Sequence, residues 1–205
     1  MKTIITVTLM WIAVIILFMS GTAILSEAKA SASNPVPSPV PSPKHFVAKA
    51  SQKPEVKSAV LPKAVDDYLW KKSRESGFSY YLLLALAKQE SNLDITCVSS
   101  TGDYGLLQIN KRTAKGIAAK LGLRHYNLMD YKTSIDFSLY HLSSLRAYWG
   151  KKGYKGKRLE RMLLLSYHRG VAGARGYVKK HGRKNAYVQN IENYKTQYER
   201  EAILL

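Results

Sequence analysis

Residues 100–110 read Ser-Thr-Gly-Asp-Tyr-Gly-Leu-Leu-Gln-Ile-Asn. The glycines and the short runs of β-type residues in this stretch indicate loops and a small hairpin. The chain before it has a different pattern, because Leu82–Ala87 is an unbroken apolar run that is typical of a buried helix. Glu90 lies between the two patterns. Since functional residues concentrate on irregular segments held by a rigid scaffold, we expect polar chemistry where this insertion meets the helices.

Helical periodicity dominates the chain on both sides of the insertion. Val65 and Leu69 begin a first helix, which is expected to end near Gly77. Further helices are predicted where apolar residues recur at helical spacing: Ile135, Leu139, Leu142 and Leu145; Met162–Leu165; and Tyr187, Ile191, Tyr194 and Tyr198. The sequence therefore predicts a mainly helical α+β domain with one small β-hairpin or loop insertion beside the helix that carries Glu90.

Composition narrows the class of protein. The 205 residues are 46% hydrophobic and 22% charged, which fits a globular protein and argues against disorder of the whole chain. Cys97 is the single cysteine, so an intrachain disulfide and a Cys-rich zinc site are both excluded. The five histidines lack metal-ligand spacing, and no glycine-rich nucleotide motif occurs. We therefore expect no metal and no cofactor.

The first 30 residues have the features of an export signal or of a membrane anchor. A positive start precedes an apolar run at residues 4–19, and small-x-small patterns at 28–32 offer sites for signal peptidase. The apolar stretch through Leu25 is also just long enough to span a bilayer. Both hypotheses stay open for residues 1–30. Either one places the rest of the chain outside the cytoplasm, secreted or anchored in the cell envelope.

Residues 31–63 are predicted to be a linker. A Val-Pro-Ser-Pro repeat within 34–43 favours an extended polyproline spacer. Residues 44–63 are rich in lysine and show little periodicity, so we expect a solvated tether there. All seven prolines lie before residue 63. This change of composition marks the start of the folded domain, residues 64–205.

The formal net charge is +18, from 32 Lys and Arg against 14 Asp and Glu. Such a surplus draws a protein to anionic polymers, which outside a cell include wall polymers and acidic glycan peptides. A nucleic-acid-binding protein is the competing class, but the export segment argues against nucleic acid as a partner. Basic pairs such as Lys71-Lys72, Lys151-Lys152 and Lys179-Lys180 are scattered along the chain. We therefore expect a diffuse positive field.

Glu90 has the position that a general acid needs. A glutamate at the end of a helix is usually a solvated surface residue, but here the helix is apolar and the following segment is rich in glycine. Partial burial would raise the pKa of the carboxyl group and keep it protonated near neutral pH. A carboxylic acid in that state can protonate a glycosidic oxygen.

Four short blocks follow one another along the domain. They are Glu90-Ser91; Gly-Leu-Leu-Gln-Ile at 105–109, with Thr113-Ala114 after it; Ser-Tyr-His-Arg-Gly at 166–170; and Ala-Tyr-Val-Gln-Asn-Ile at 186–191. They resemble the E-S-x-[FL], G-L-[ML]-Q-[IL], A-Y-N-x-G and Y-V-x-x-I motifs of the soluble lytic transglycosylase domain, which belongs to the lysozyme-like superfamily. Each block alone is a weak signal, but their shared order makes the resemblance specific.

The resemblance implies an exported peptidoglycan lytic transglycosylase that acts on glycan strands as a monomer. Glu90 would be its single catalytic acid and base, oriented by a tyrosine. It would protonate the oxygen between N-acetylmuramic acid and N-acetylglucosamine and then accept the proton of the sugar's own 6-hydroxyl, which leaves a 1,6-anhydro end. This scheme needs no second carboxylate, unlike the usual glycosidase pair. The residues implied in substrate binding or orientation are Ser91, Ser99, Gly105, Leu106, Leu107, Gln108, Tyr167, His168 and Tyr187.

Parts of this set have more specific implied roles. Gln108 and the backbone of residues 105–107 would line the glycan groove, with Ser99 nearby. Tyr167 and His168 would form another wall of the groove. The family usually has asparagine at the position of His168. A histidine can donate a hydrogen bond from the same place, but its charge depends on pH.

Asp103 keeps a second mechanism open. The stretch 100–110 is also similar to the S-T-D-Y-G-[IL]-L-Q-I-N strand of animal-type lysozymes, in which the aspartate is the second catalytic carboxylate. The protein would then be a muramidase, a hydrolase that uses Glu90 and Asp103. The alternative is an aspartate that holds a turn beside Gly102 through hydrogen bonds. A hypothesis of another class is an inactive envelope protein that binds glycan or an anionic polymer.

Overall fold

The computed structural model describes residues 52–182 and 184–203. These ranges contain helices α2 Lys63–Ser76, α3 Tyr80–Ser91, α4 Lys111–Lys120, α5 Tyr131–Lys151, α6 Gly156–His181 and α7 Ala186–Ile203, and strands β1 Asp103–Tyr104 and β2 Ile109–Asn110. The predicted mainly helical α+β architecture with a small hairpin is confirmed. Residues 1–51, with the expected signal or anchor and the proline repeat, lie outside the described residues. None of the described helices is long and apolar enough to cross a membrane.

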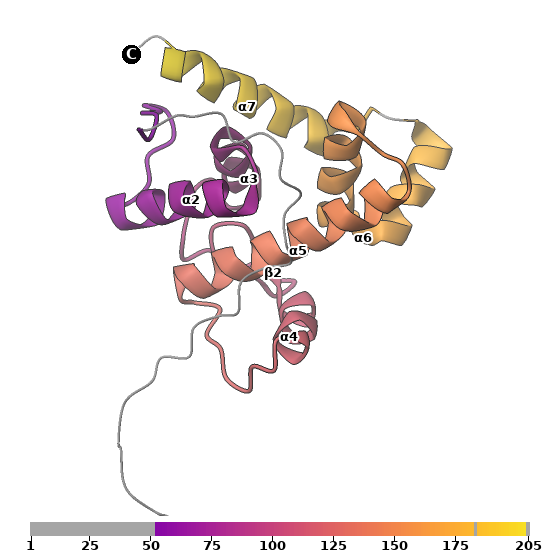
Figure 1. Cartoon of the computed structure of the whole chain (residues 1–205), viewed down its shortest axis with the longest axis horizontal. Helices are drawn as coiled ribbons and strands as arrows, with labels where there is room; N and C mark the ends of the chain where they lie inside the picture. Colours follow the sequence, from indigo (N-terminus) through magenta and orange to yellow (C-terminus); the bar gives the residue numbers. More distant parts are fainter. Residues whose placement is uncertain (1–51, 183, 204–205) are drawn as a thin grey trace, which may run out of the picture. The chain divides into compact units, whose positions relative to one another are not determined.

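Helix α3 forms the centre of the core. Its leucines are almost fully buried, as expected of an unbroken apolar run, and the helix packs mainly against α7 (Figure 1). It ends because Asn92 adopts a left-handed conformation, with φ of 54°, and donates its N–H to the carbonyl of Lys88, while the N–H of Leu93 donates to that of Ala87. Glu90 therefore lies in the last turn of a helix that is otherwise enclosed by its neighbours.

Helix α5 supports the rest of the bundle. It packs against α2 and α6 and also contacts α4 and β2. Asp130 caps its first turn, because its side chain accepts a hydrogen bond of 3.0 Å from the backbone N–H of Thr133. The predicted apolar stripe at Ile135, Leu139, Leu142 and Leu145 is buried. The helix thus presents one continuous apolar face to the core.

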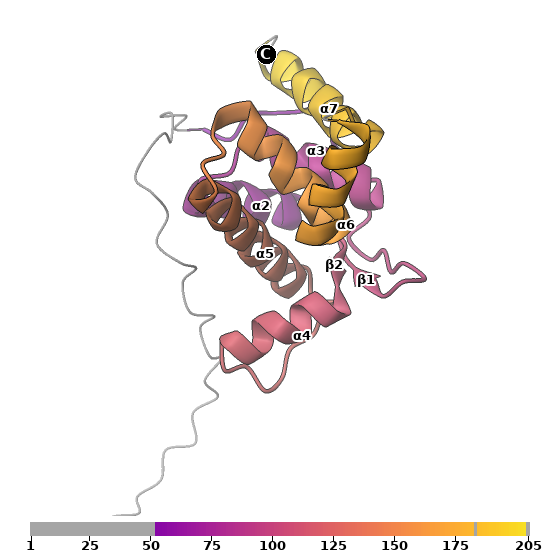
Figure 2. The same cartoon turned by 90° about the vertical axis from the view of Figure 1, so that its right-hand side faces the viewer.

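The predicted hairpin follows α3. Strands β1 and β2 lie side by side (Figure 2) and pair antiparallel. Asp103 is opposite Asn110. Gly105 begins the connecting turn with φ of 72°, in the left-handed region. A Cβ atom at Gly105 would lie 2.7 Å from Oγ of Ser134 on α5. The backbone therefore approaches α5 more closely than a residue with a side chain would allow.

Helix α4 is an element that the periodicity does not predict. Its 10 residues include Gly116, which lowers helix propensity, and few apolar side chains. The helix begins because Asn110 at the end of β2 accepts a hydrogen bond of 2.9 Å from the backbone N–H of Arg112. Its buried face joins the hairpin and α5 in a second apolar cluster: Ile109, Ala114, Ile117, Ala118, Leu128 and Phe137.

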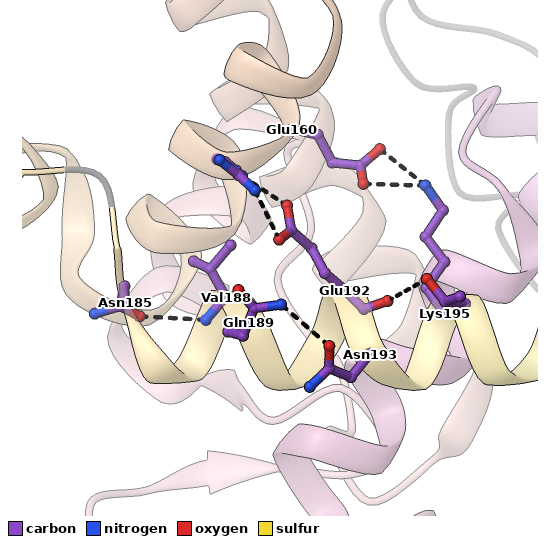
Figure 3. A network of polar contacts seen from close by, with 9 residues as sticks. Glu160, Asn185, Val188, Gln189, Glu192, Asn193 and Lys195 are labelled. Atoms are coloured by element: carbon purple, nitrogen blue, oxygen red, sulfur yellow. Dashed lines mark hydrogen bonds and ion pairs between the residues drawn. The ribbon is translucent and has the colours of Figure 1, made fainter.

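Helix α6 is bent, and ion pairs connect it to α7. The backbone leaves helical geometry at Gly170, where φ is 68° and ψ is 164°, so α6 consists of two segments that meet at a kink. Arg161 on the first segment donates two hydrogen bonds to Glu192 on α7, at 2.7 and 3.0 Å. Glu160 accepts two from Lys195, at 3.1 and 3.3 Å (Figure 3). These contacts hold α7 along α6.

Residues 52–62 differ from the solvated tether that was expected there. Val56 and Ala59 are buried in the main core, and Ser58 donates hydrogen bonds of 3.0 and 2.6 Å to the carboxylate of Glu201 on α7. Lys53 makes an ion pair of 2.6 Å with Asp67 on α2. The apolar residues are three positions apart and therefore face the same side of a short turn. This part of the expected linker packs on the domain.

We predict that Gly105→Ala destabilises the protein more than Gly102→Ala does. Both glycines have positive φ, at 72° and 78°, so alanine at either one adds about 1 kcal/mol of backbone strain. At Gly102 nothing lies within 4 Å of the added Cβ, whereas at Gly105 it overlaps Ser134. Overpacking should add about 1–3 kcal/mol at Gly105 alone. Urea unfolding measures both variants, and equal losses of unfolding free energy would contradict the close approach to α5.

Candidate active site

Glu90 has a carboxyl group poised to change its protonation state near neutral pH. The side chain is half-buried in the last turn of α3. Burial raises the pKa of Glu90 to about 7; the hydrogen bond from Tyr187 opposes this rise, and the charge of Asp103 adds to it. The sequence argument from partial burial therefore agrees with the geometry. At neutral pH a large share of the molecules carries a protonated Glu90.

Tyr187 is the hydrogen-bond partner of Glu90. Its hydroxyl donates to Oε1 of Glu90 from a position 97 residues away in the sequence, in the first turn of α7. Asn185 caps this turn by accepting a hydrogen bond of 3.2 Å from the backbone N–H of Val188. Burial and the charge of Glu90 hold the pKa of Tyr187 well above 10. The phenol therefore stays a donor across the whole range in which Glu90 titrates.

His168 stacks on the ring of Tyr187. The two ring centroids are 4.4 Å apart and the planes differ by 15°. The His168 residue is exposed overall. Partial burial and the charge of Arg169 lower the pKa of His168, so the imidazole is mainly neutral at pH 7. The structure thus places His168 where it restricts the plane of the tyrosine ring that holds Glu90.

Tyr167 precedes His168 and faces the hairpin. Its hydroxyl donates a hydrogen bond of 2.7 Å to the carbonyl of Leu107. Burial raises its pKa, and the charge of Glu90 raises it further. Tyr167 is therefore close enough to Glu90 to sense its charge. The Tyr167 ring also lies 5.5 Å from the ring of His141 on α5.

Ser91 fastens the hairpin to the end of α3. Its hydroxyl lies 2.8 Å from the carbonyl of Leu106 and 3.1 Å from that of Ala87, and it is buried. The side chains of Leu106 and Leu107 are fully buried in the core. A ligand could contact this part of the turn only through its backbone, and the carbonyls of both leucines already accept a side-chain hydrogen bond. These residues position the turn beside Glu90.

Gln108 also holds the turn. It is buried and has a positive φ of 49°. Its side-chain amide donates to the carbonyl of Cys97 at 3.0 Å and to that of Gly105 at 2.9 Å. The backbone N–H of Gly105 donates to Cys97 as well, at 2.8 Å. The amide nitrogen of Gln108 is thus used inside the protein to close the hairpin.

Asp103 is the anchor of the hairpin. Oδ2 accepts hydrogen bonds from Ser99 at 2.8 Å and Thr101 at 2.5 Å, and Oδ1 accepts one from Asn110 at 2.7 Å. Burial alone would raise the pKa of Asp103, but these hydrogen bonds lower it below its usual value. Asp103 is therefore ionised at neutral pH. Both of its oxygens already have donors from the hairpin or from the loop just before it.

Two features of the site were not predicted from the sequence. Asn110 donates to Asp103 through Nδ2 and caps α4 through Oδ1, so one side chain links the hairpin to the next helix. An asparagine just before a helix is a common capping signal, which could have indicated half of this role. The stack of His168 on Tyr187 has no sequence signal, because the two residues lie on different helices.

The arrangement can perform acid and base catalysis. In residues 52–182 and 184–203, no three His, Cys, Asp or Glu side chains form a group that could hold a metal ion. At neutral pH Asp103 is ionised because hydrogen bonds stabilise its carboxylate, whereas a large share of Glu90 is protonated because the carboxyl group is desolvated. A protonated Glu90 with a fixed phenol donor can give a proton to a bound oxygen and take one back.

Comparison with known proteins agrees with this geometry. The sequence model of the family described as "Transglycosylase SLT domain" matches residues 67–190, a range that includes Glu90, the hairpin and Tyr187. No curated protein matches the chain in sequence.

Three solved structures share the fold. An inactive mutant of the lytic transglycosylase Slt from Pseudomonas aeruginosa matches with a TM-score of 0.56 and 20% identity, over 69% of this chain and 25% of that one. The 70-kDa soluble lytic transglycosylase from Escherichia coli has a TM-score of 0.55 and 22% identity, over 68% and 25%. A complex of the 70-kDa soluble lytic transglycosylase with bulgecin A has 0.55 and 22%, over 68% and 24%. The expected lysozyme-like fold is thereby confirmed, and the chain spans about a quarter of the length of each of these proteins.

The raised pKa of Glu90 predicts how stability depends on pH. The folded state binds the Glu90 proton more tightly than the unfolded state, whose glutamate has a pKa near 4.5. The stabilisation from this proton is therefore complete below about pH 4.5 and is lost as pH rises through about 7. Glu90→Gln has no such proton to lose. Between these pH values, urea unfolding should show the unfolding free energy of the wild type falling relative to that of the variant. A difference in unfolding free energy that stayed constant with pH would contradict a buried, protonated Glu90.

Removal of the Tyr187 hydroxyl should raise the pKa of Glu90. The hydrogen bond favours the carboxylate, and a bond to a charged group contributes about 1.5–3 kcal/mol. We therefore expect Tyr187→Phe to shift the pKa upward by about one to two units. NMR titration of the labelled glutamate carboxyl carbon measures the shift. Tyr194→Phe, on the same helix, is the matched control and should leave the pKa unchanged.

Proposed function

Because this chain belongs to the Transglycosylase SLT domain family, we propose that it is a lytic transglycosylase that cleaves the glycan strands of peptidoglycan. The bond cleaved is the one between N-acetylmuramic acid and N-acetylglucosamine. The observation that carries this proposal is the pair of Glu90 and Tyr187, a half-buried carboxyl group with a pKa of about 7 held by a phenol donor. It provides the acid that breakage of a glycosidic bond requires.

In the first step, protonated Glu90 donates its proton to the glycosidic oxygen. The bond between that oxygen and the anomeric carbon breaks, and the leaving sugar departs with a new hydroxyl group. Glu90 is now a carboxylate, which the hydroxyl of Tyr187 stabilises through its hydrogen bond. Because Tyr187 donates to Oε1 alone, the second carboxyl oxygen is free to carry the proton.

In the second step, Glu90 acts as a base. It accepts the proton of the 6-hydroxyl of the same muramic acid while that oxygen attacks the anomeric carbon. The product is a 1,6-anhydro end, no water enters the reaction, and Glu90 returns to its protonated state. A pKa near 7 suits both steps, because the group must give and take a proton at the same working pH.

The hydrogen bonds of Asp103 favour this single-carboxyl mechanism. Three donors occupy its two oxygens: two come from the loop just before β1 and one comes from β2. A nucleophilic carboxylate would have to give up part of that network when it attacks. The hydrolase alternative rests on the charge of Asp103, which is felt at Glu90. It would use water as the acceptor of the glycosyl group and leave a reducing end.

The site of action follows from the substrate. Peptidoglycan lies outside the cytoplasm, so we propose that the domain works in the cell envelope, secreted or held by the segment at residues 1–30. The net charge of +18 would favour its approach to an anionic wall.

Mass spectrometry of digested peptidoglycan tests the proposal. The wild type should release muropeptides that end in 1,6-anhydro-muramic acid, and Glu90→Gln should reduce their release by at least about 10³-fold, because it removes the proton donor and the base together. Reducing ends from the wild type would establish the hydrolase instead. Release of nothing by either protein would favour the inactive binding hypothesis.

Asp103→Asn separates the two roles of the aspartate. We expect a loss of about 1–2 kcal/mol in unfolding free energy, because the hydrogen bonds to a charged acceptor are weakened. The anhydro products should persist, with activity reduced by about tenfold or less. Urea unfolding and product analysis measure the two effects. If Asp103→Asn abolished cleavage as completely as Glu90→Gln while remaining folded, Asp103 would be a catalytic carboxylate.

A further inference from the structure

The kink in α6 creates two adjoining cavities away from Glu90. Their volumes are about 300 and 530 Å³, within the range of small-molecule sites. Tyr154, Met162 and Val178 line both of them. Val178 reaches this position because α6 bends at Gly170, which returns its second segment toward the first. Figure 1 shows the bent helix next to the start of α7.

The floor of the cavities is apolar. The first cavity is closed by Leu165 of α6 and by Val188 of α7, and both of these residues are buried. Figure 3 shows Val188 on α7, one turn before Glu192. Apolar surface in an open cavity is favourable only when something apolar covers it. The floor is therefore suited to the hydrocarbon part of a ligand.

The rim of the same cavities is cationic. Helix α6 carries seven Lys or Arg residues against the single acid Glu160. Those that line the cavities are Lys157, Arg158, Arg161, Arg175 and Lys179. The sequence led us to expect a diffuse field over the whole protein. Around α6, the kink places Lys157 and Lys179 on adjoining cavities that share Tyr154, Met162 and Val178. The linear spacing of the charges does not reveal this local concentration.

One of these five cations has an anionic partner among the described residues. Arg161 is neutralised by Glu192, and Glu160 is already bound to Lys195. Within the described part of the chain, the other four rim cations make no ion pair. The guanidinium of Arg158 lies over the ring of Tyr154, 4.4 Å from its centroid, which leaves its N–H groups directed along a fixed plane. Such a rim is complementary to a multiply charged anion.

We propose that the α6 cavities bind a lipid phosphate, with its alkyl chain on the apolar floor and its phosphate among Lys157, Arg158, Arg175 and Lys179. A phosphate group matches the rim because it carries up to two charges and accepts from several arginine and lysine donors at once. A free ion would leave the floor exposed, and an uncharged chain would leave the cations without a partner. This site is independent of glycan cleavage at Glu90, so either proposal can fail alone.

Calorimetric titration with decyl phosphate, below its micelle concentration, tests the site. The expected result is saturable binding to one site, with inorganic phosphate and decyl maltoside each binding at least about tenfold more weakly. If inorganic phosphate binds equally well, the apolar floor does not contribute and the proposal is wrong. It is equally wrong if decyl maltoside binds as tightly, or if decyl phosphate shows no saturable binding.

Variants locate the binding. The double substitution Lys157→Gln with Lys179→Gln should weaken decyl phosphate binding by about tenfold. Lys111→Gln with Lys115→Gln removes the same charge from the exposed face of α4 and should change affinity less than about twofold. Equal weakening by both pairs would indicate general attraction and overturn the site. Val178→Trp should fill the floor and abolish binding without changing the charge; circular dichroism checks its folding.

Discussion

The hydrogen bond from Tyr187 to Glu90 is the contact on which the rest of the structure depends. It joins the end of α3 to the start of α7, it holds a half-buried acid in position, and it limits the rise in pKa that burial causes. Each neighbouring feature preserves it. The ion pairs between α6 and α7 hold α7 in place, Asn185 caps its first turn, and His168 restricts the tyrosine ring.

The hairpin gives the second carboxyl group the opposite environment. Glu90 is desolvated with one donor, whereas Asp103 is hydrogen-bonded from three sides, so their pKa values move apart. Ser91 and Tyr167 fasten the turn to α3 and α6 through the carbonyls of its leucines. The short segment between two helices thus serves mainly as a rigid wall. Its geometry explains why glycine is required where the backbone passes Ser134 of α5.

Much of this could be predicted from sequence, for physical reasons. The apolar run Leu82–Ala87 predicted a buried helix, and the glycine-rich stretch after it predicted an irregular segment. Glu90 lies between the two and was therefore the candidate acid. Helix α4 was not predicted, because it depends on a cap and on packing rather than on apolar periodicity. The sequence also did not predict the packing of Val56 or the stacking of His168 on Tyr187, because both are contacts between distant segments. The cationic cavities were not predicted for the same reason, since the kink at Gly170 places the Lys and Arg residues of the two segments of α6 on adjoining cavities.

The central claim is that Glu90 alone directs an intramolecular attack, so that no solvent oxygen enters the product. Digestion of peptidoglycan in water labelled with oxygen-18 tests it most directly, because the label reports the identity of the nucleophile for each bond broken. The account predicts unlabelled muramic acid ends that are one water lighter than hydrolysed ends. One labelled oxygen at each new muramic acid end would contradict it and would make water the acceptor.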